Sequence, residues 1–76
     1  MDISEIRVVI ASDVSDRDGI GVELYHGGEM LMEVFRDDTK REREVTLYRK
    51  DLPLSIVEYG IQQFKLEVPC DYIDDR

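Results

Sequence analysis

Three carboxylates and a glycine fall within seven residues, where residues 13–19 read Asp-Val-Ser-Asp-Arg-Asp-Gly. Such a cluster suggests a calcium loop between two helices, which has glycine at loop position six. With Gly19 at that position, Val14 and Tyr25 occupy positions one and twelve, where the loop requires carboxylates. Asp, Ser and Gly are also ordinary turn formers. We therefore predict an acidic turn, and only weak cation binding by Asp13, Asp16 and Asp18 stays open.

The remaining reactive side chains are too few to form a catalytic or metal centre. His26 is the single histidine and Cys70 the single cysteine, whereas structural zinc sites combine several such ligands. Cysteine–histidine catalysis would need the two side by side, but one flanks a predicted hairpin turn and the other follows Pro69 in the tail. No glycine loop has the strand–loop–helix setting that holds phosphate. The sequence predicts no enzyme, no metal and no cofactor.

Length and composition indicate one small domain over residues 1–76, with 42% hydrophobic residues. No stretch is long and apolar enough to cross a bilayer, and the N-terminus lacks the regions of a signal peptide. One cysteine permits no intrachain disulfide, which favours a reducing compartment. We expect a cytoplasmic protein.

The net charge is −8 and is unevenly spread. Residues 1–35 carry −6 and residues 51–76 carry −4, whereas residues 36–50 hold six bases and four acids. Direct nucleic-acid binding is disfavoured, because it rests on Lys and Arg neutralising phosphates. A basic protein partner is the better expectation.

Hydropathy patterns predict four strands and one helix. The run Ile6 to Ala11 is almost wholly apolar, so we expect a central strand buried on both faces. Alternating strands follow over residues 20–25, 30–35 and 44–48, and residues 36–42 form a polar connection. In the fourth strand, Val45 and Leu47 point inward.

The strands over residues 20–25 and 30–35 are joined at Gly27-Gly28, a strong hairpin signal. A two-residue loop pairs Tyr25 with Met30 and Leu24 with Leu31, but sets Val22 against Glu33. A three-residue loop would oppose Glu23 and Glu33, which is destabilising, so the two-residue loop is preferred.

A helix follows the strands and ends by Leu66 or Glu67, because Pro69 excludes helical geometry at Val68. Asp51 is the expected cap and Pro53 fits the first turn. Leu54, Val57, Ile61 and Phe64 form one helical stripe. Gly60 is a mid-helix weakness that would permit close approach to the sheet. Residues 69–76 are an acidic tail expected to be loose.

The predicted fold is therefore α+β: a four-stranded, mostly antiparallel sheet with one C-terminal helix packed on one face. The segments "IRVVIASD" and "GVELYHGGEMLMEVFRDD", followed by this helix, resemble short acidic bacterial proteins that are uncharacterised or of immunity-protein type. The resemblance covers about residues 3–67, and it carries over no functional residue.

We expect a binding protein that neutralises a basic partner, such as an immunity protein or antitoxin blocking a nuclease toxin. Tyrosine suits such an interface because it buries area while keeping a polar tip. The candidate partner-binding residues are Asp13, Asp16, Asp18, Glu23, Tyr25, Glu29, Glu33, Asp71, Tyr72, Asp74 and Asp75. The alternatives are a phage-type inhibitor that mimics nucleic acid, and a regulatory or structural homodimer that associates through its uncovered sheet face.

Overall fold

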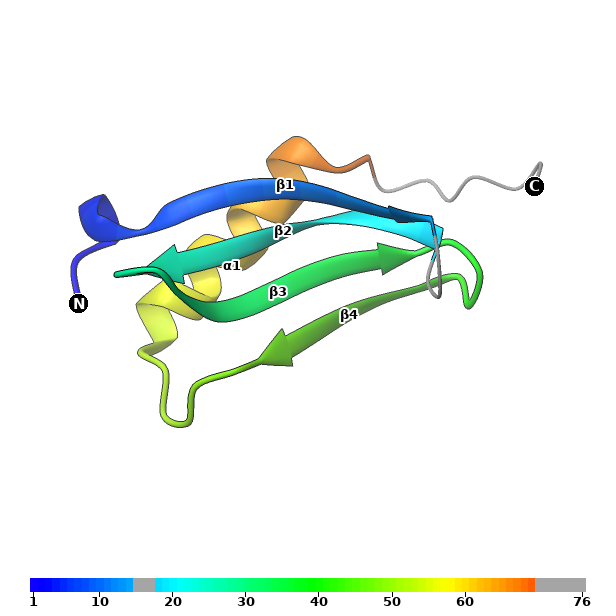
Figure 1. Ribbon diagram of the computed structural model, residues 1–76. Coiled ribbons are helices and arrows are strands. Elements are labelled where there is room, and N and C mark those ends of the chain that lie inside the picture. The colour runs from blue at the N-terminus through cyan, green and yellow to red at the C-terminus, as the bar shows by residue number, and fades with distance from the viewer. Residues whose placement is uncertain (15–17, 70–76) are drawn as a thin grey trace.

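The computed structural model describes residues 1–14 and 18–69, which form one sheet and one long helix (Figure 1). The elements are η1 (Ile3–Glu5), β1 (Arg7–Val14), β2 (Asp18–His26), β3 (Glu29–Asp37), β4 (Glu42–Leu47) and α1 (Leu54–Glu67). The strands pair antiparallel in the order β1-β2-β3-β4. The predicted α+β fold is confirmed. The predicted loose tail, apart from Pro69, lies outside the described residues.

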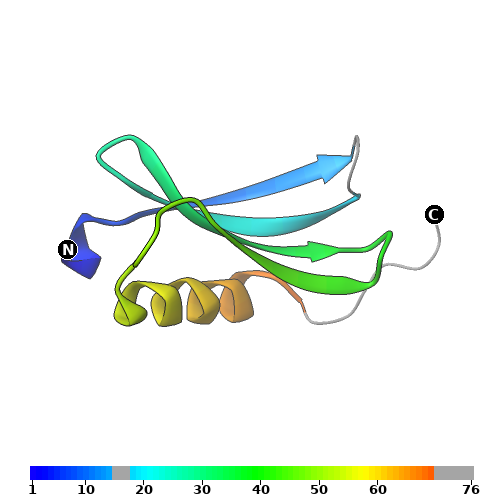
Figure 2. The same ribbon diagram turned by 90° about the horizontal axis from the view of Figure 1, so that it is seen from below.

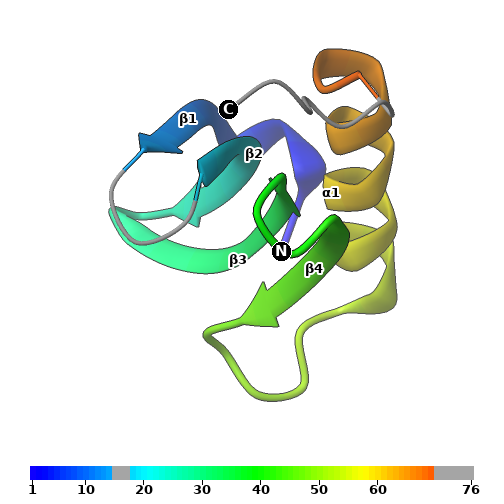
Figure 3. The same ribbon diagram turned by 90° about the vertical axis from the view of Figure 1, so that its right-hand side faces the viewer.

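The molecule has two layers, with α1 packed along one face of the sheet (Figures 2 and 3). The helix contacts β2 and β3. The core includes Val22, Leu24, Met32 and Val34 from these strands and Ile56 and Phe64 from α1. Gly60 lets the helix backbone come close to the sheet, because a Cβ there would lie 2.8 Å from Met32 Cε. Burial of these apolar side chains is the main force holding the layers together.

The prediction that the first strand is central is wrong, because β1 forms an edge of the sheet. Val8 and Val9 are half-buried and Ile10 is 44% exposed. A continuous apolar run is typical of a strand covered on both faces. Here only one neighbouring strand and one helix are available to cover it.

The hairpin between β2 and β3 turns at Gly27 and Gly28, as predicted, with φ of +58° and +82°. The expected register is wrong beyond Tyr25 and Met30, because the pairing shifts there and Leu24 faces Met32. The shift lets Leu31 and Met32 both enter the core, and it places Glu33 opposite Glu23. Without it, Glu33 would face Val22 inside the core. Burying an unpaired carboxylate among apolar groups costs more than opposing two carboxylates across a strand pair.

The helix ends at Glu67 as predicted, but it buries a different stripe. Ile56, Gly60 and Phe64 are buried, whereas Leu54 is 70% exposed. The helix carries apolar residues around much of its circumference, so periodicity admits more than one stripe. Contact of Gly60 with Met32 and Leu24 selects the observed one.

The predicted cap is also wrong. Pro53 occupies the N-cap position without a side-chain hydrogen bond, and Asp51 lies in the preceding turn with φ of +56°. The turn before α1 therefore uses the tolerance of Asp for left-handed geometry rather than its capping oxygen.

Arg36, predicted to lie in a polar connection, belongs to β3 and is 4% exposed. Its Nε and Nη2 donate to the two carboxylate oxygens of Asp38 at 2.8 and 3.1 Å, and its Nη1 donates to the Pro69 carbonyl at 3.0 Å. The ion pair holds the Arg36 guanidinium in place, and its hydrogen bond to Pro69 ties the end of β3 to the chain leaving α1. Paired, hydrogen-bonded charges are the form in which such groups are tolerated in an interior.

Candidate interaction face

Successive side chains of a strand point to opposite faces of a sheet, so the register assigns each residue to a face. Val22, Leu24, Met32 and Val34 point toward α1. Their neighbours Val9, Glu23, Glu33 and Thr46 are aligned in one row across the four strands and point to the opposite face. No element of residues 1–14 and 18–69 covers that opposite face (Figures 2 and 3).

Carboxylates gather on this uncovered surface, which we call the acidic face. It carries the side chains of Asp13, Glu23, Glu33, Asp37, Glu42 and Glu44. Arg7 is the one cation contributed there by the described strand residues. Lys40 Nζ also lies 2.7 Å from Glu44 Oε2.

Tyr25 stands on the acidic face between a cation and an anion. Its hydroxyl donates to Glu23 Oε1 at 2.8 Å, and the Arg7 guanidinium carbon lies 5.1 Å from its ring centroid. The hydrogen bond to Glu23 raises the pKa of the Tyr25 hydroxyl above its ordinary value, and partial burial and the negative charge of Glu23 add to this. The ring is thus held by contacts at both ends, as suits a preorganised contact residue.

Two members of the acidic face are largely buried. Glu33 is 5% exposed and Asp37 is 1% exposed. Asp37 Oδ1 accepts hydrogen bonds from the backbone N–H groups of Thr39 and Lys40, both at 3.0 Å, and so shapes the turn into β4. The accessible part of the acidic face is therefore formed by Asp13, Glu23, Glu42 and Glu44.

The structure brings together only some of the predicted partner-binding residues. Asp13, Glu23, Tyr25 and Glu33 share the acidic face. Asp18 pairs with Val14 on the opposite side of the pleat, and Glu29 is exposed beside the hairpin turn. The residues Asp16, Asp71, Tyr72, Asp74 and Asp75 lie outside the described part of the chain.

Glu42 and Glu44 were missed by the sequence reasoning, which began the fourth strand at Glu44 and ascribed no role to either. The signal was present, because Glu42 and Glu44 alternate with Arg43 and Val45. Extending the period-two pattern back to Glu42 puts both acids on one face and Arg43 on the other.

The acidic stretch at residues 13–19 joins two strands. Asp13 pairs with Gly19 and Val14 with Asp18 in antiparallel register, whereas a calcium loop of the kind considered above lies between helices. Across residues 1–14 and 18–69, no group of three or more His, Cys, Asp or Glu side chains is placed to hold a metal ion. His26 Nε2 lies 3.5 Å from Glu5 Oε1, and Cys70 lies outside the described residues.

None of the helices in the described residues has the length and apolarity needed to cross a membrane. Comparisons with protein-family models, curated proteins and solved structures found no match.

Proposed function

We propose that the chain is a small binding protein that uses the acidic face to occlude a basic surface of a partner protein. The observation that carries this proposal is that the alternation of side chains along the strands places carboxylates together on one face of the sheet. Four accessible strand carboxylates, those of Asp13, Glu23, Glu42 and Glu44, share this face with one strand cation, Arg7. Complementary charge speeds encounter and fixes the orientation of docking.

Tyr25 supplies the anchor in this proposal. Its ring already accepts the Arg7 guanidinium and its hydroxyl is fixed by Glu23. A partner lysine or arginine would meet the same combination of aromatic face and carboxylate. Val9 and Ala11 lie half-buried on the same face and add apolar area to it.

The class of partner we place first is a toxin that acts on nucleic acid, because the site of such a toxin is itself cationic. The resemblance to immunity-type proteins points the same way. In this account the chain acts as an immunity protein or antitoxin, without catalysis of its own, in the cytoplasm.

The test begins by cross-linking the protein in its native host and identifying the captured partner by mass spectrometry. The purified pair is then compared at low and moderate salt, where we expect the association rate to fall roughly tenfold or more. Glu23→Lys and Glu42→Lys should each slow association.

The matched control is Glu67→Lys, which makes the same change in net charge at an exposed position on α1. It should have a much smaller effect. Equal slowing by all three variants would show that only net charge matters, and the acidic face would then have no role as a docking surface.

A further inference from the structure

The side of the molecule that carries α1 also leaves an apolar surface uncovered. The helix contacts β2 and β3, so β4 extends beyond it. Val45 and Leu47 point to the helix side of the sheet, as predicted, yet they are 48% and 53% exposed. Leu54 at the start of α1 is 70% exposed. We call Val45, Leu47, Leu54 and Ile61 the α1–β4 surface.

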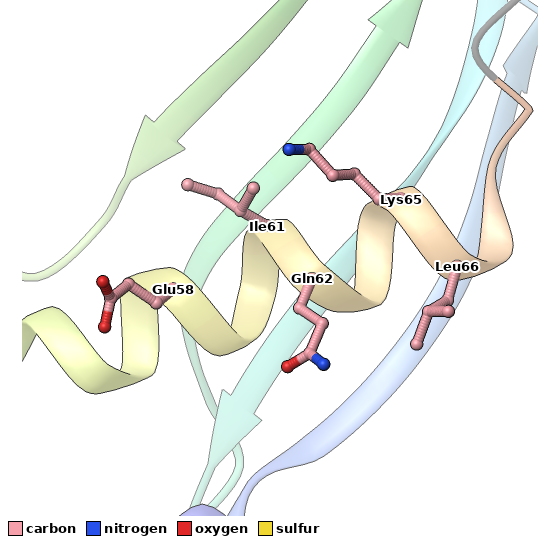
Figure 4. A pocket seen from close by; sticks show the side chains of 5 residues that line it. All are labelled: Glu58, Ile61, Gln62, Lys65 and Leu66. Atoms are coloured by element: carbon pink, nitrogen blue, oxygen red, sulfur yellow. The ribbon is translucent and has the colours of Figure 1, made fainter.

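This surface is hollowed in two adjoining places. A hollow of about 260 Å³ between α1 and β4 is lined by Val34, Arg43, Val45, Ile61, Phe64 and Lys65. A second, of about 390 Å³, lies on the outer side of α1 among Glu58, Ile61, Gln62, Lys65 and Leu66 (Figure 4). Ile61 and Lys65 line both hollows, and we call the two hollows together the trough.

The charges along this trough would be complementary to those of a second copy of the same surface. Glu58 and Lys65 are seven residues apart, which is close to two helical turns, so they lie on one side of α1 with Ile61 between them. If a second α1 ran antiparallel to the first, Glu58 of each would meet Lys65 of the other. A two-fold axis near Ile61 produces this arrangement, and two-fold contacts are the commonest in homo-oligomers.

The rest of the chain argues against other modes of self-association. Two copies of a chain with net charge −8 repel each other through the acidic face. Around the trough, in contrast, Arg43 and Lys65 offset Glu58.

Edge-to-edge pairing of β4 is also disfavoured. A register centred on Glu44 opposes two glutamates, and one centred on Arg43 opposes two arginines, which is destabilising. Edge pairing would also leave Val45 and Leu47 exposed on the helix side.

We infer that a second copy of this chain covers the α1–β4 surface, with the two α1 helices antiparallel and each close to the β4 strand of the other copy. The acidic faces then point outward from the dimer and stay accessible. This dimer does not depend on the proposed function, and its surface differs from the uncovered sheet face considered in the sequence analysis.

Sedimentation equilibrium of the full chain tests the inference, over roughly 10 µM to 1 mM protein, a range that detects weak association. At about 0.15 M salt, where charges are screened beyond about 8 Å, the mean mass should rise from monomer toward dimer. Val45→Glu and Ile61→Glu should each weaken dimerisation at least tenfold. Ile10→Glu is the matched control, because Ile10 lies on the same face at the opposite edge and is 44% exposed. It should leave dimerisation unchanged.

A charge exchange tests the antiparallel arrangement. Glu58→Lys and Lys65→Glu should each weaken the dimer, because each opposes like charges, and the double variant should restore it. The double variant keeps the net charge, so restoration cannot come from reduced repulsion. A chain that stays monomeric up to 1 mM, a dimer insensitive to Val45→Glu and Ile61→Glu, or a double variant weaker than both single ones would overturn the inference.

Discussion

The Phe35 ring on β3 lies against Gly21 on β2, close enough that a Cβ at Gly21 would come within 2.9 Å of Phe35 Cδ1. Gly19 leaves similar room beside the same ring, with 3.1 Å to Phe35 Cε2. Phe35 is only 2% exposed although no described element covers its face of the sheet. The ring therefore fills the space that two glycines leave, as aromatic residues do across glycine in designed sheets.

Gly21→Ala should lower the free energy of unfolding by about 2 to 3 kcal/mol, near the upper end for overpacked sites. The new Cβ would overlap the Val34 carbonyl oxygen and lie 2.8 Å from Phe35 Cα, so the backbone of β3 would have to move. Urea denaturation followed by circular dichroism measures the change.

Gly28→Ala is the control for this substitution. Gly28 has φ of +82° and open space around it, so alanine there adds only left-handed strain of about 1 kcal/mol. A loss at Gly21 no larger than the loss at Gly28 would contradict close contact between β2 and β3.

Asp38→Asn should destabilise the protein by about 3 kcal/mol, because it leaves the Arg36 guanidinium buried without its counter-charge. Arg36 and Asp38 are 4% and 6% exposed. The exposed pair Lys40–Glu44, at 2.7 Å, offers a comparison. Lys40→Met should cost at most about 1 kcal/mol, since water already screens that pair. If urea denaturation gave comparable losses of unfolding free energy for the two variants, water would reach the Arg36–Asp38 pair more than its burial indicates.

The pKa of the Tyr25 hydroxyl should lie above the ordinary tyrosine value of 10.0, because the hydroxyl donates a hydrogen bond to Glu23 and its ionisation would place a second negative charge beside that carboxylate. This pKa is higher in the folded state than in the unfolded state. The protonated Tyr25 hydroxyl therefore contributes fully to the free energy of unfolding below about pH 10. This contribution is lost as pH rises through the raised pKa.

Nuclear magnetic resonance of the Tyr25 ring follows this titration directly. Glu23→Gln should lower the pKa of Tyr25, since it removes the charge at the hydrogen-bond acceptor. Glu29→Gln removes an exposed carboxylate beside the hairpin turn and should change the pKa much less. If the two substitutions shift the pKa equally, the hydrogen bond between Tyr25 and Glu23 is not the cause.

Local patterns in the sequence were enough to predict the four strands and the helix α1. Alternating residues in β2, β3 and β4 mark the strands, Gly27-Gly28 marks a hairpin, and Pro69 marks the end of α1. These signals act through backbone geometry within a few residues, so they do not depend on the rest of the chain. For the site, Asp13, Glu23, Tyr25 and Glu33 were visible as candidates, but their grouping was not, and Asp37, Glu42 and Glu44 were missed.

Only the tertiary structure decided which side chains share a surface. The register shift at Leu31 moves Glu33 from the core to the acidic face, and the contact of Gly60 with Met32 turns Leu54 outward. Both outcomes depend on the relative cost of burying competing side chains between two layers. A one-residue change of register exchanges the two faces of a strand, so it decides which side chains are buried. The cost of burying them arises only when the helix and the sheet pack together, and local sequence patterns do not contain it.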